Sequence, residues 1–341
     1  MTIYYFKNQI PNVVSVGSEP EFQGKFFLII FFYIISFVFG ILEVTRDNTS
    51  QSFLPQIVKK ESLSDANGKL FGVEITFNSF LGAPLAGFLI GVSLYTPFVG
   101  VAALLILSVF YVSKITGNFE PEDSSLDRKT SEMIKEGLLW MSKQVLIKRL
   151  AIFTGVANFI GSMSFPVMIL FAQEILLLNS VQFGFLTYGA AAGGVLGSLV
   201  AKQIHEKIGE GNGISFAVFL FCVGCAIFYF TSSAWIFAFG FFLISFGSVM
   251  WNVLAVSIRQ EIIPDKLLGR VNSVYRLLAL GSVPIGALLG GSIVKYSEYF
   301  LTREFALRLP FLIESICMMV LFVLSISLLT QKLIDNTRQE K

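Results

Sequence analysis

The sequence predicts an all-α membrane protein, a polytopic helix bundle with about nine transmembrane helices. Of its 341 residues, 54% are hydrophobic and 14% are charged, and the mean hydropathy is +0.73. Ordinary soluble domains carry about 25% charged residues. A soluble fold of this length could not hide the 36 phenylalanines of this chain in one core. Most of the surface is therefore expected to face lipid.

Apolar segments of bilayer-crossing length recur along the chain. A hydrocarbon core of about 30 Å requires roughly 17–25 apolar residues in each helix. Nine segments meet or approach this length: 26–43, 73–94, 97–112, 150–172, 183–200, 214–230, 235–256, 271–294 and 311–329. The third is short, and its junction with the second lies near Pro97.

Lysine and arginine are distributed unevenly between alternate loops, and most of the 25 fall on one side of the predicted membrane. Cytoplasmic loops retain these residues, so the C-terminus is predicted to be cytoplasmic, in a plasma membrane. The expected divisions are an extracytoplasmic segment (1–24), an incomplete three-helix bundle (25–113), a cytoplasmic central loop (114–148), a six-helix bundle (149–330) and a cytoplasmic tail (331–341).

Two stretches of the chain repeat each other in order. Residues 64–68 (SDANG) align with 269–273 (GRVNS), and residues 82–87 (GAPLAG) align with 286–291 (GALLGG). Each pair occupies a predicted cytoplasmic loop followed by a Gly/Pro-rich helix. The first three helices then correspond to the last three, as in the two halves of a repeated transporter. Chance similarity between glycine-rich apolar runs is the alternative.

This repeat predicts a twelve-helix architecture from which the first three spans are missing, because the counterparts of the fourth to sixth helices would precede Met1. An independently functional nine-helix protein is the competing interpretation. The linker before the six-helix bundle contains an amphipathic stretch from Met133 to Leu146. It either lies flat on the inner leaflet or packs as an ordinary helix.

Three stretches resemble the major facilitator superfamily, and within it the branch of drug and siderophore exporters that includes macrolide and enterobactin exporters. Residues 263–273 (IPDKLLGRVNS), followed by 284–291, resemble its eleventh helix and the preceding loop. Residues 46–48, 54–55 and 63–67 resemble its fourth helix and following loop. Residues 197–209 are similar to its Gly-x-x-x-Asp-Arg-x-Gly loop, although Ala201 stands near the acidic position.

The resemblance implies a secondary transporter that works by alternating access, and a drug or siderophore type of efflux substrate. Aromatic, weakly charged walls favour a small amphipathic substrate over a sugar or a phosphate. Proton coupling is expected because the chain has no Gly-x-x-x-x-Gly-Lys-Ser/Thr phosphate loop for ATP hydrolysis. The alternative is a truncated, transport-inactive remnant or a membrane-embedded partner protein.

Ionisable groups within or near lipid are the default site candidates, because an unpaired charge there costs several kcal/mol. The substrate or proton candidates are Glu43, Arg46, Asp47, Glu174, Trp251, Asn252, Arg276 and Glu314. Each charged one has a simpler alternative: an ion pair within the helix for the first three, an interfacial position for Glu174, snorkelling for Arg276 and a helix N-terminus for Glu314. The gating-loop candidates are Gly197, Lys202, Gly209, Gly269 and Arg270.

Other classes of chemistry are not expected. His205 is the single histidine, so a multi-histidine metal site is excluded, and Cys222 and Cys225 are interpreted as small buried residues. Neither an enzyme nor a bound cofactor is predicted, since no clustered catalytic residues are found. The net charge of +2 gives no reason to expect nucleic acid. The expected partners are the lipid bilayer, a small molecule and protons, and the oligomeric state stays open.

Small residues and prolines complete the prediction. Gly189, Gly193 and Gly197 recur every four residues, as do Gly286 and Gly290, and such faces serve either static packing or sliding between helices. Pro84, Pro166 and Pro284 are expected to interrupt their helices, because proline removes one backbone hydrogen bond.

Overall fold

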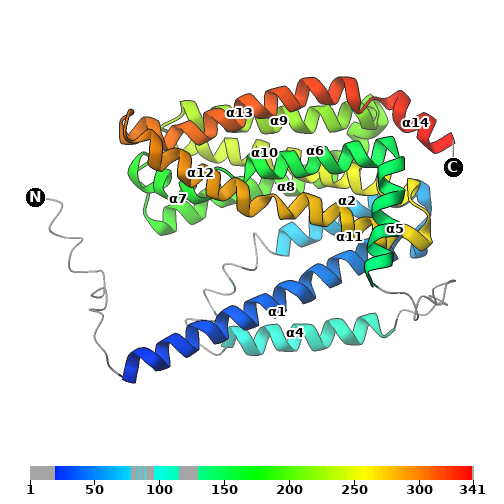
Figure 1. Ribbon diagram of the computed structural model, residues 1–341, viewed down its shortest axis with the longest axis horizontal. Coiled ribbons are helices and arrows are strands. Elements are labelled where there is room, and N and C mark those ends of the chain that lie inside the picture. Colours follow the sequence, from blue (N-terminus) through cyan, green and yellow to red (C-terminus); the bar gives the residue numbers. More distant parts are fainter. Residues whose placement is uncertain are drawn as a thin grey trace, which may run out of the picture. The chain divides into compact units, whose positions relative to one another are not determined.

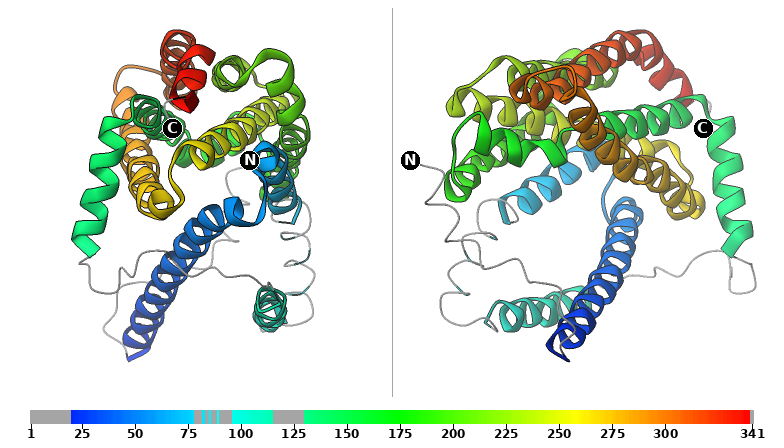
Figure 2. Two further views of the ribbon diagram at one scale, coloured as in Figure 1. Left: turned by 90° about the vertical axis from the view of Figure 1, so that its right-hand side faces the viewer. Right: turned by 60° about the vertical axis from the view of Figure 1, so that its left-hand side comes forward.

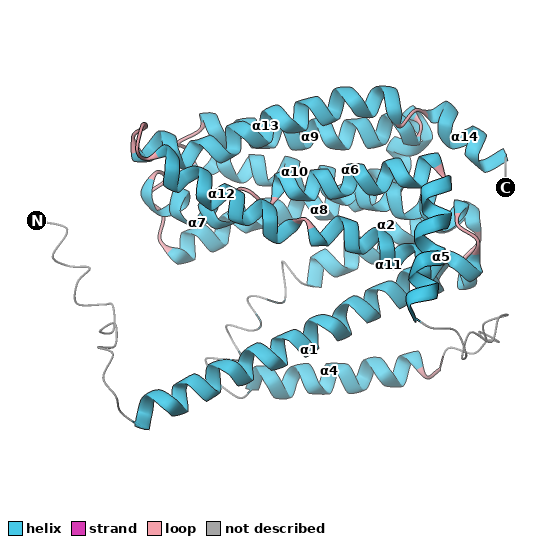
Figure 3. Ribbon diagram, viewed as in Figure 1, coloured by secondary structure: helices cyan, strands magenta, loops and turns pink. Residues whose placement is uncertain are grey.

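The structure is a computed structural model that describes residues 20–77, 82, 85, 89, 96–114 and 130–339 (Figure 1). Every regular element among these residues is a helix (Figure 3), which confirms the predicted all-α polytopic bundle. The chain divides into two compact units, Met1–Ser50 and Gln51–Lys341, which are described separately.

The first unit contains most of helix α1 (Pro20–Ile57), which includes the first predicted segment and ends in the second unit. Arg46 Nη2 lies 2.7 Å from Asp47 Oδ1 and 3.9 Å from Glu43 Oε1. The side chains of Glu43 and Arg46 are largely exposed. The structure therefore shows these three candidates as ion pairs along one helix.

Among the described residues, six continuous or interrupted helices of the second unit are long and apolar enough to cross a membrane. They are α6 with α7 (Val145–Gly161 and Phe165–Glu174), α8 (Ser180–Ile208), α9 (Glu210–Phe230), α10 (Ala234–Ile262), α11 with α12 (Asp265–Gly281 and Val283–Ser297) and α13 (Arg303–Leu328). The fourth to ninth predicted segments each fall mainly within one of them. The shorter α4 (Thr96–Val112) covers the third segment, whereas the second lies mostly outside the described residues. The total of nine spans therefore stays a prediction.

Two of the spans are interrupted, and both interruptions are followed by proline. α7 and α12 carry Pro166 and Pro284 in their first turns, where a missing N–H costs nothing. These two predicted interruptions are confirmed, and Pro84 lies outside the described residues. The two breaks also meet, because Asn158 Nδ2 donates to Ala279 O at 2.8 Å.

Glycine lets the backbones of α8 and α10 touch. A Cβ atom at Gly197 would lie 2.6 Å from Phe246 O. A Cβ at Gly189 or Gly193 would overlap the backbone of α10 in the same way. This geometry supports static packing, the first of the two roles that the spacing allowed.

One end of the bundle, called here the α14 end, carries α5 (Thr130–Lys143) and α14 (Gln331–Gln339) (Figures 1 and 2). Arg338 of α14 binds Glu210 at 2.8 Å and also pairs with Glu261, which joins α14 to α9 and α10. Burial lowers the pKa of Arg338, but its hydrogen bonds and ion pairs with the two carboxylates outweigh burial and raise it. Arg338 therefore stays charged, and it fixes α14 on the bundle.

At the opposite end, the buried Arg308 of α13 caps the C-terminus of α9. Its guanidinium donates to Thr231 O at 2.9 Å, to Tyr229 O and to Ser232 Oγ, and it lies 5.2 Å from the ring of Phe171. The last carbonyl groups of a helix have no partner within the helix. Arg308 supplies one and joins α9 to α13.

We expect Arg308→Ala to lower the free energy of unfolding by about 2–4 kcal/mol, because buried carbonyl groups lose a charged donor. The control is Arg303→Ala at the same end. Arg303 pairs with Glu174 and Glu298 but is 43% exposed, so its loss should cost about 1 kcal/mol or less. Thermal unfolding of both variants in detergent measures the difference, and equal losses would contradict the capping role.

Candidate functional site

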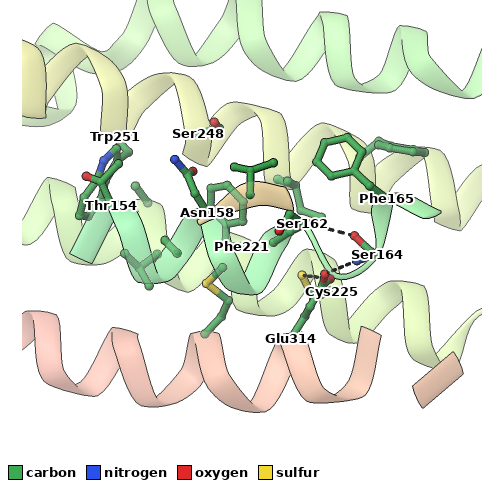
Figure 4. Close-up of a pocket in the computed structure, with 18 of the residues that line it drawn as sticks. Thr154, Asn158, Ser162, Ser164, Phe165, Phe221, Cys225, Ser248, Trp251 and Glu314 are labelled. Atoms are coloured by element: carbon green, nitrogen blue, oxygen red, sulfur yellow. Dashed lines mark hydrogen bonds between the residues drawn. The ribbon is translucent and has the colours of Figure 1, made fainter. Parts of the chain in front are cut away.

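A cavity of about 480 Å³ lies inside the second unit, among the interrupted helix α6/α7, α9, α10, α13 and the break between α11 and α12 (Figure 4). Its walls are mainly apolar and aromatic, and they include Phe165, Phe221, Phe228, Phe241 and Trp251. Concave, largely apolar cavities with a few polar groups are typical of small-molecule sites.

Most hydroxyl and amide side chains of the cavity come from two parts of the chain. Thr154, Asn158, Ser162 and Ser164 belong to α6 or to the break after it, and Ser248 and Asn252 belong to α10. Hydroxyl and amide groups can donate or accept hydrogen bonds. The cavity can therefore orient a molecule that is mostly apolar.

Glu314 is the single carboxylate among the residues that line this cavity. Its side chain is almost fully buried, at 1% exposure, in the middle of α13. Oε1 accepts the backbone N–H of Ser164 at 2.7 Å, and Oε2 accepts the thiol of Cys225 at 3.6 Å (Figure 4). Both hydrogen-bond partners are neutral groups.

The contact with Ser164 places the carboxylate at a helix terminus, because Ser164 directly precedes α7. The free N–H groups of a first turn carry partial positive charge, which favours an anion. The break between α6 and α7 thus creates the donor that Glu314 uses. The charge of Glu314 therefore acts on the N–H group that starts α7, next to Phe165 in the cavity wall.

The structure brings three of the predicted candidates together. Trp251, Asn252 and Glu314 line the same cavity. Glu174 instead binds Arg303 at 2.7 Å at the end of α7. Arg276 is half-buried on α11 and is not among the lining residues, while Glu43, Arg46 and Asp47 belong to the first unit.

The assignment of four gating candidates to loops is wrong. Gly197 and Lys202 lie inside α8, and Gly269 and Arg270 lie in the first turns of α11. Gly209 alone occupies a junction, with φ +81°, between α8 and α9. Charged and polar turns extend α8 at its C-terminal end and α11 at its N-terminal end beyond the apolar segments, where hydropathy gives no helical signal.

Four of the gating candidates lie next to identifiable neighbours. Arg270 binds Glu136 of α5 at 2.7 Å, and Lys202 lies 3.9 Å from Glu206 within α8. A Cβ at Gly209 would meet Gln331 Oε1 of α14 at 2.7 Å, and a Cβ at Gly269 has room beside Ser52. These positions join helices at the α14 end rather than form one site.

The two asparagines of the sequence repeat bind neighbouring residues of α10. Asn67, on α2 (Leu63–Ile75), donates to Gln260 Oε1 at 2.7 Å and to Ser257 Oγ at 3.1 Å. Asn272, on α11, accepts from Arg259 Nη1 at 3.0 Å. Both repeats begin a helix that binds the same end of α10, which supports a real internal repeat. Residues 64–68, expected in a loop, are helical.

The contact of α2 with α8 is equally close. A Cβ at Gly68 would lie 2.8 Å from Ser198 O, and a Cβ at Gly72 would lie 3.6 Å from the Cβ of Ser198. Together with the Asn67 hydrogen bonds, this forms a close contact that we call the α2 contact (Asn67, Gly68 and Gly72 against Ser198, Ser257 and Gln260).

Sequence reasoning missed several cavity residues, above all Ser164 and Cys225. Ser164 precedes Pro166 by two residues, a place where helix N-termini commonly fall, and this signal was available. Cys225 was interpreted as a small buried residue, which it is, but its thiol also reaches Glu314. Among the residues described here, no three His, Cys, Asp or Glu side chains gather as metal ligands.

Comparison with known proteins gives two findings. The sequence model of the Major Facilitator Superfamily matches residues 150–341. No curated protein sequence matches the chain.

Two solved structures share the fold. Both are crystal structures of a bacterial homologue of the iron transporter ferroportin in an outward-facing state, and the second was soaked with iron. The first is 15% identical with a TM-score of 0.59, covering 83% of this chain and 68% of that one. The second is 16% identical with a TM-score of 0.54, covering 80% and 65%. The chain therefore spans about two thirds of these similar structures, and the likeness concerns the fold alone.

Proposed function

The chain belongs to the Major Facilitator Superfamily, a family of membrane transporters, and on that premise we propose that it exports a small amphipathic molecule in exchange for protons. The cavity beside Glu314 is the proposed substrate site. The α14 end is assigned to the cytoplasm, because the lysine and arginine of the loops gather there.

The single observation that carries this proposal is the place of Glu314. Its carboxylate is 1% exposed, lines the cavity and accepts the N–H that starts α7. A buried carboxylate inside the membrane is costly when charged and unpaired, so protonation is a natural way to discharge it. The Glu314 carboxylate can then bind the proton while it is hydrogen-bonded to the start of α7, which forms part of the cavity wall.

Coupling follows from the hydrogen bond with Ser164. A charged acceptor binds an N–H more strongly than a neutral one, by roughly a factor of two in energy. Protonation therefore weakens the bond between α13 and the start of α7. Phe165, the residue after Ser164, would shift with α7 and change the shape of the cavity wall. Three other titratable groups lie near this site. Cys225 and Cys317 interact with Glu314, and Cys222 interacts with Cys225.

Alternating access also requires a gate at each end of the cavity. The α2 contact is the proposed cytoplasmic gate, because it joins the predicted first bundle (25–113) to α8 and α10 of the second (149–330). Opening toward the cytoplasm would separate Asn67 from Gln260.

The substrate class is drawn from the walls of the cavity. Aromatic side chains and one carboxylate suit an amphipathic organic molecule, and hydroxyl groups would orient it. The direction of transport rests on the resemblance to drug and siderophore exporters. The fold shared with the ferroportin homologue does not extend that protein's iron to this chain, because identities of 15% and 16% concern architecture alone.

The test reconstitutes the full chain in liposomes that hold a fluorescent pH indicator, with ethidium as the transported probe. We expect a proton gradient to drive ethidium movement, and ethidium to move protons. Glu314→Gln should reduce both to the background of empty liposomes, since a glutamine of similar shape cannot carry the proton. Glu206→Gln, an exposed position paired with Lys202, is the control and should keep both activities.

Unchanged coupled flux in Glu314→Gln would overturn the coupling role. If the folded native chain moves neither ethidium nor protons, transport by this chain is rejected and the alternative of a transport-inactive partner protein is favoured. Ethidium flux without proton flux would keep a transporter but reject the proton as its coupling ion.

A further inference from the structure

Helix α5 lies outside the six candidate spans, at the α14 end. It runs across the ends of α6 and α11 rather than alongside them (Figure 1). Seen from that end, it follows one side of the bundle instead of covering its middle (Figure 2, left). With the candidate spans crossing a bilayer, this place corresponds to the border of the membrane.

One face of α5 is fixed to α11. A Cβ at Gly137 would lie 2.9 Å from Arg270 O, so glycine brings the two backbones together. Glu136 binds Arg270 at 2.7 Å, and Met141 is 4% exposed.

In the part of the chain that the structure describes, the flank of α5 next to this face is apolar and exposed. Ile134 and Leu138 lie one turn apart on it and are 49% and 48% exposed. Lys135 borders Leu138 on the side away from Gly137 and Met141, and it is exposed. An aliphatic stripe edged by lysine is the pattern of a helix that lies in a membrane interface.

The exposed leucines of the neighbouring α11 indicate that lipid is the partner of this stripe. α11, on which α5 packs, exposes Leu277 at 69% and Leu278 at 44% toward the surroundings of a membrane span. The uncovered side chains of α5 continue this lipid-facing surface at the cytoplasmic border. Anionic lipids of the inner leaflet attract lysine side chains near the membrane surface.

We propose that α5 docks on the inner leaflet through Ile134 and Leu138, with Lys135 at anionic headgroups, and so holds the start of α11 through the Glu136–Arg270 pair. The cytoplasmic assignment of this end rests on the proposed function. The docking itself requires only a membrane at this border. The bilayer thereby braces the same helix whose Asn272 binds α10.

The test attaches a bimane fluorophore to single cysteines in the full chain, in vesicles of phosphatidylcholine and phosphatidylglycerol. Leu138→Cys should be quenched by lipids brominated near the top of their acyl chains and shielded from aqueous iodide. Glu206→Cys, exposed at the same end, is the matched control and should show the reverse. The unsubstituted chain gives the labelling background of Cys222, Cys225 and Cys317.

A second variant tests the charge. Lys135→Glu should lower the lipid quenching at Leu138→Cys in the mixed vesicles to the level in phosphatidylcholine alone. The proposal is overturned if Leu138→Cys is as open to iodide as Glu206→Cys, or if shielding appears only when a second protein is added. No transport is measured, so these outcomes are independent of the flux experiment.

Discussion

Replacing Gly290 with alanine is expected to lower the free energy of unfolding by about 3 kcal/mol or more, at the upper end of what overpacking costs. Gly290 of α12 lies against the backbone carbonyl of Met163, in the break between α6 and α7, and an added Cβ would overlap it. Gly286, one turn earlier, meets Phe159 O and Ser162 Oγ in the same way. The contact is with backbone, which cannot move aside as a flexible side chain can.

Gly291→Ala is the matched control one residue away. A Cβ at Gly291 has open space around it, and alanine favours a helix over glycine by about 1 kcal/mol. We therefore expect Gly291→Ala to leave the protein unchanged or slightly more stable. Thermal unfolding in detergent, followed by light scattering and intrinsic fluorescence, measures both variants. Equal unfolding temperatures would show that the two interrupted helices do not depend on this contact.

The sequence predicted the interruptions but not their meeting. Pro166 and Pro284 indicate local breaks, and glycine spacing indicates faces for close packing. Neither signal says which helix receives which face, because Gly290 and Met163 are far apart in the chain. That information lies in the three-dimensional packing of α12 on α7 and cannot be read from either segment alone.

In the candidate site, too, the sequence indicates one residue but not its partners. Glu314 could be found from sequence, since a carboxylate in an apolar segment is conspicuous. Its partners could not, because a backbone N–H carries no sequence signature and Cys225 looks like any small buried residue. The helical position of Arg270 was missed for another reason. Asp265 and its polar neighbours begin α11 outside the apolar segment, where hydropathy gives no helical signal.

Locking the α2 contact with a disulfide is expected to stop transport completely. A Cβ at Gly72 would lie 3.6 Å from the Cβ of Ser198, and disulfides require about 3.5–4.5 Å. Gly72→Cys with Ser198→Cys should therefore form a bond between α2 and α8 on mild oxidation. The proposed cytoplasmic gate could then no longer open, and ethidium flux should fall to the background of empty liposomes.

Reduction separates a locked gate from a damaged protein. A thiol reductant should restore the flux of the double variant, while each single variant should transport with or without oxidant. The three native cysteines lie on other helices than α2 and α8, since Cys222 and Cys225 are buried on α9 and Cys317 is half-buried on α13. Full flux through a protein shown by gel mobility to be cross-linked would mean that α2 and α8 stay together throughout the cycle. In that case the hydrogen bonds from Asn67 to Gln260 and Ser257 would be permanent packing of one rigid body, and the gate would have to lie elsewhere.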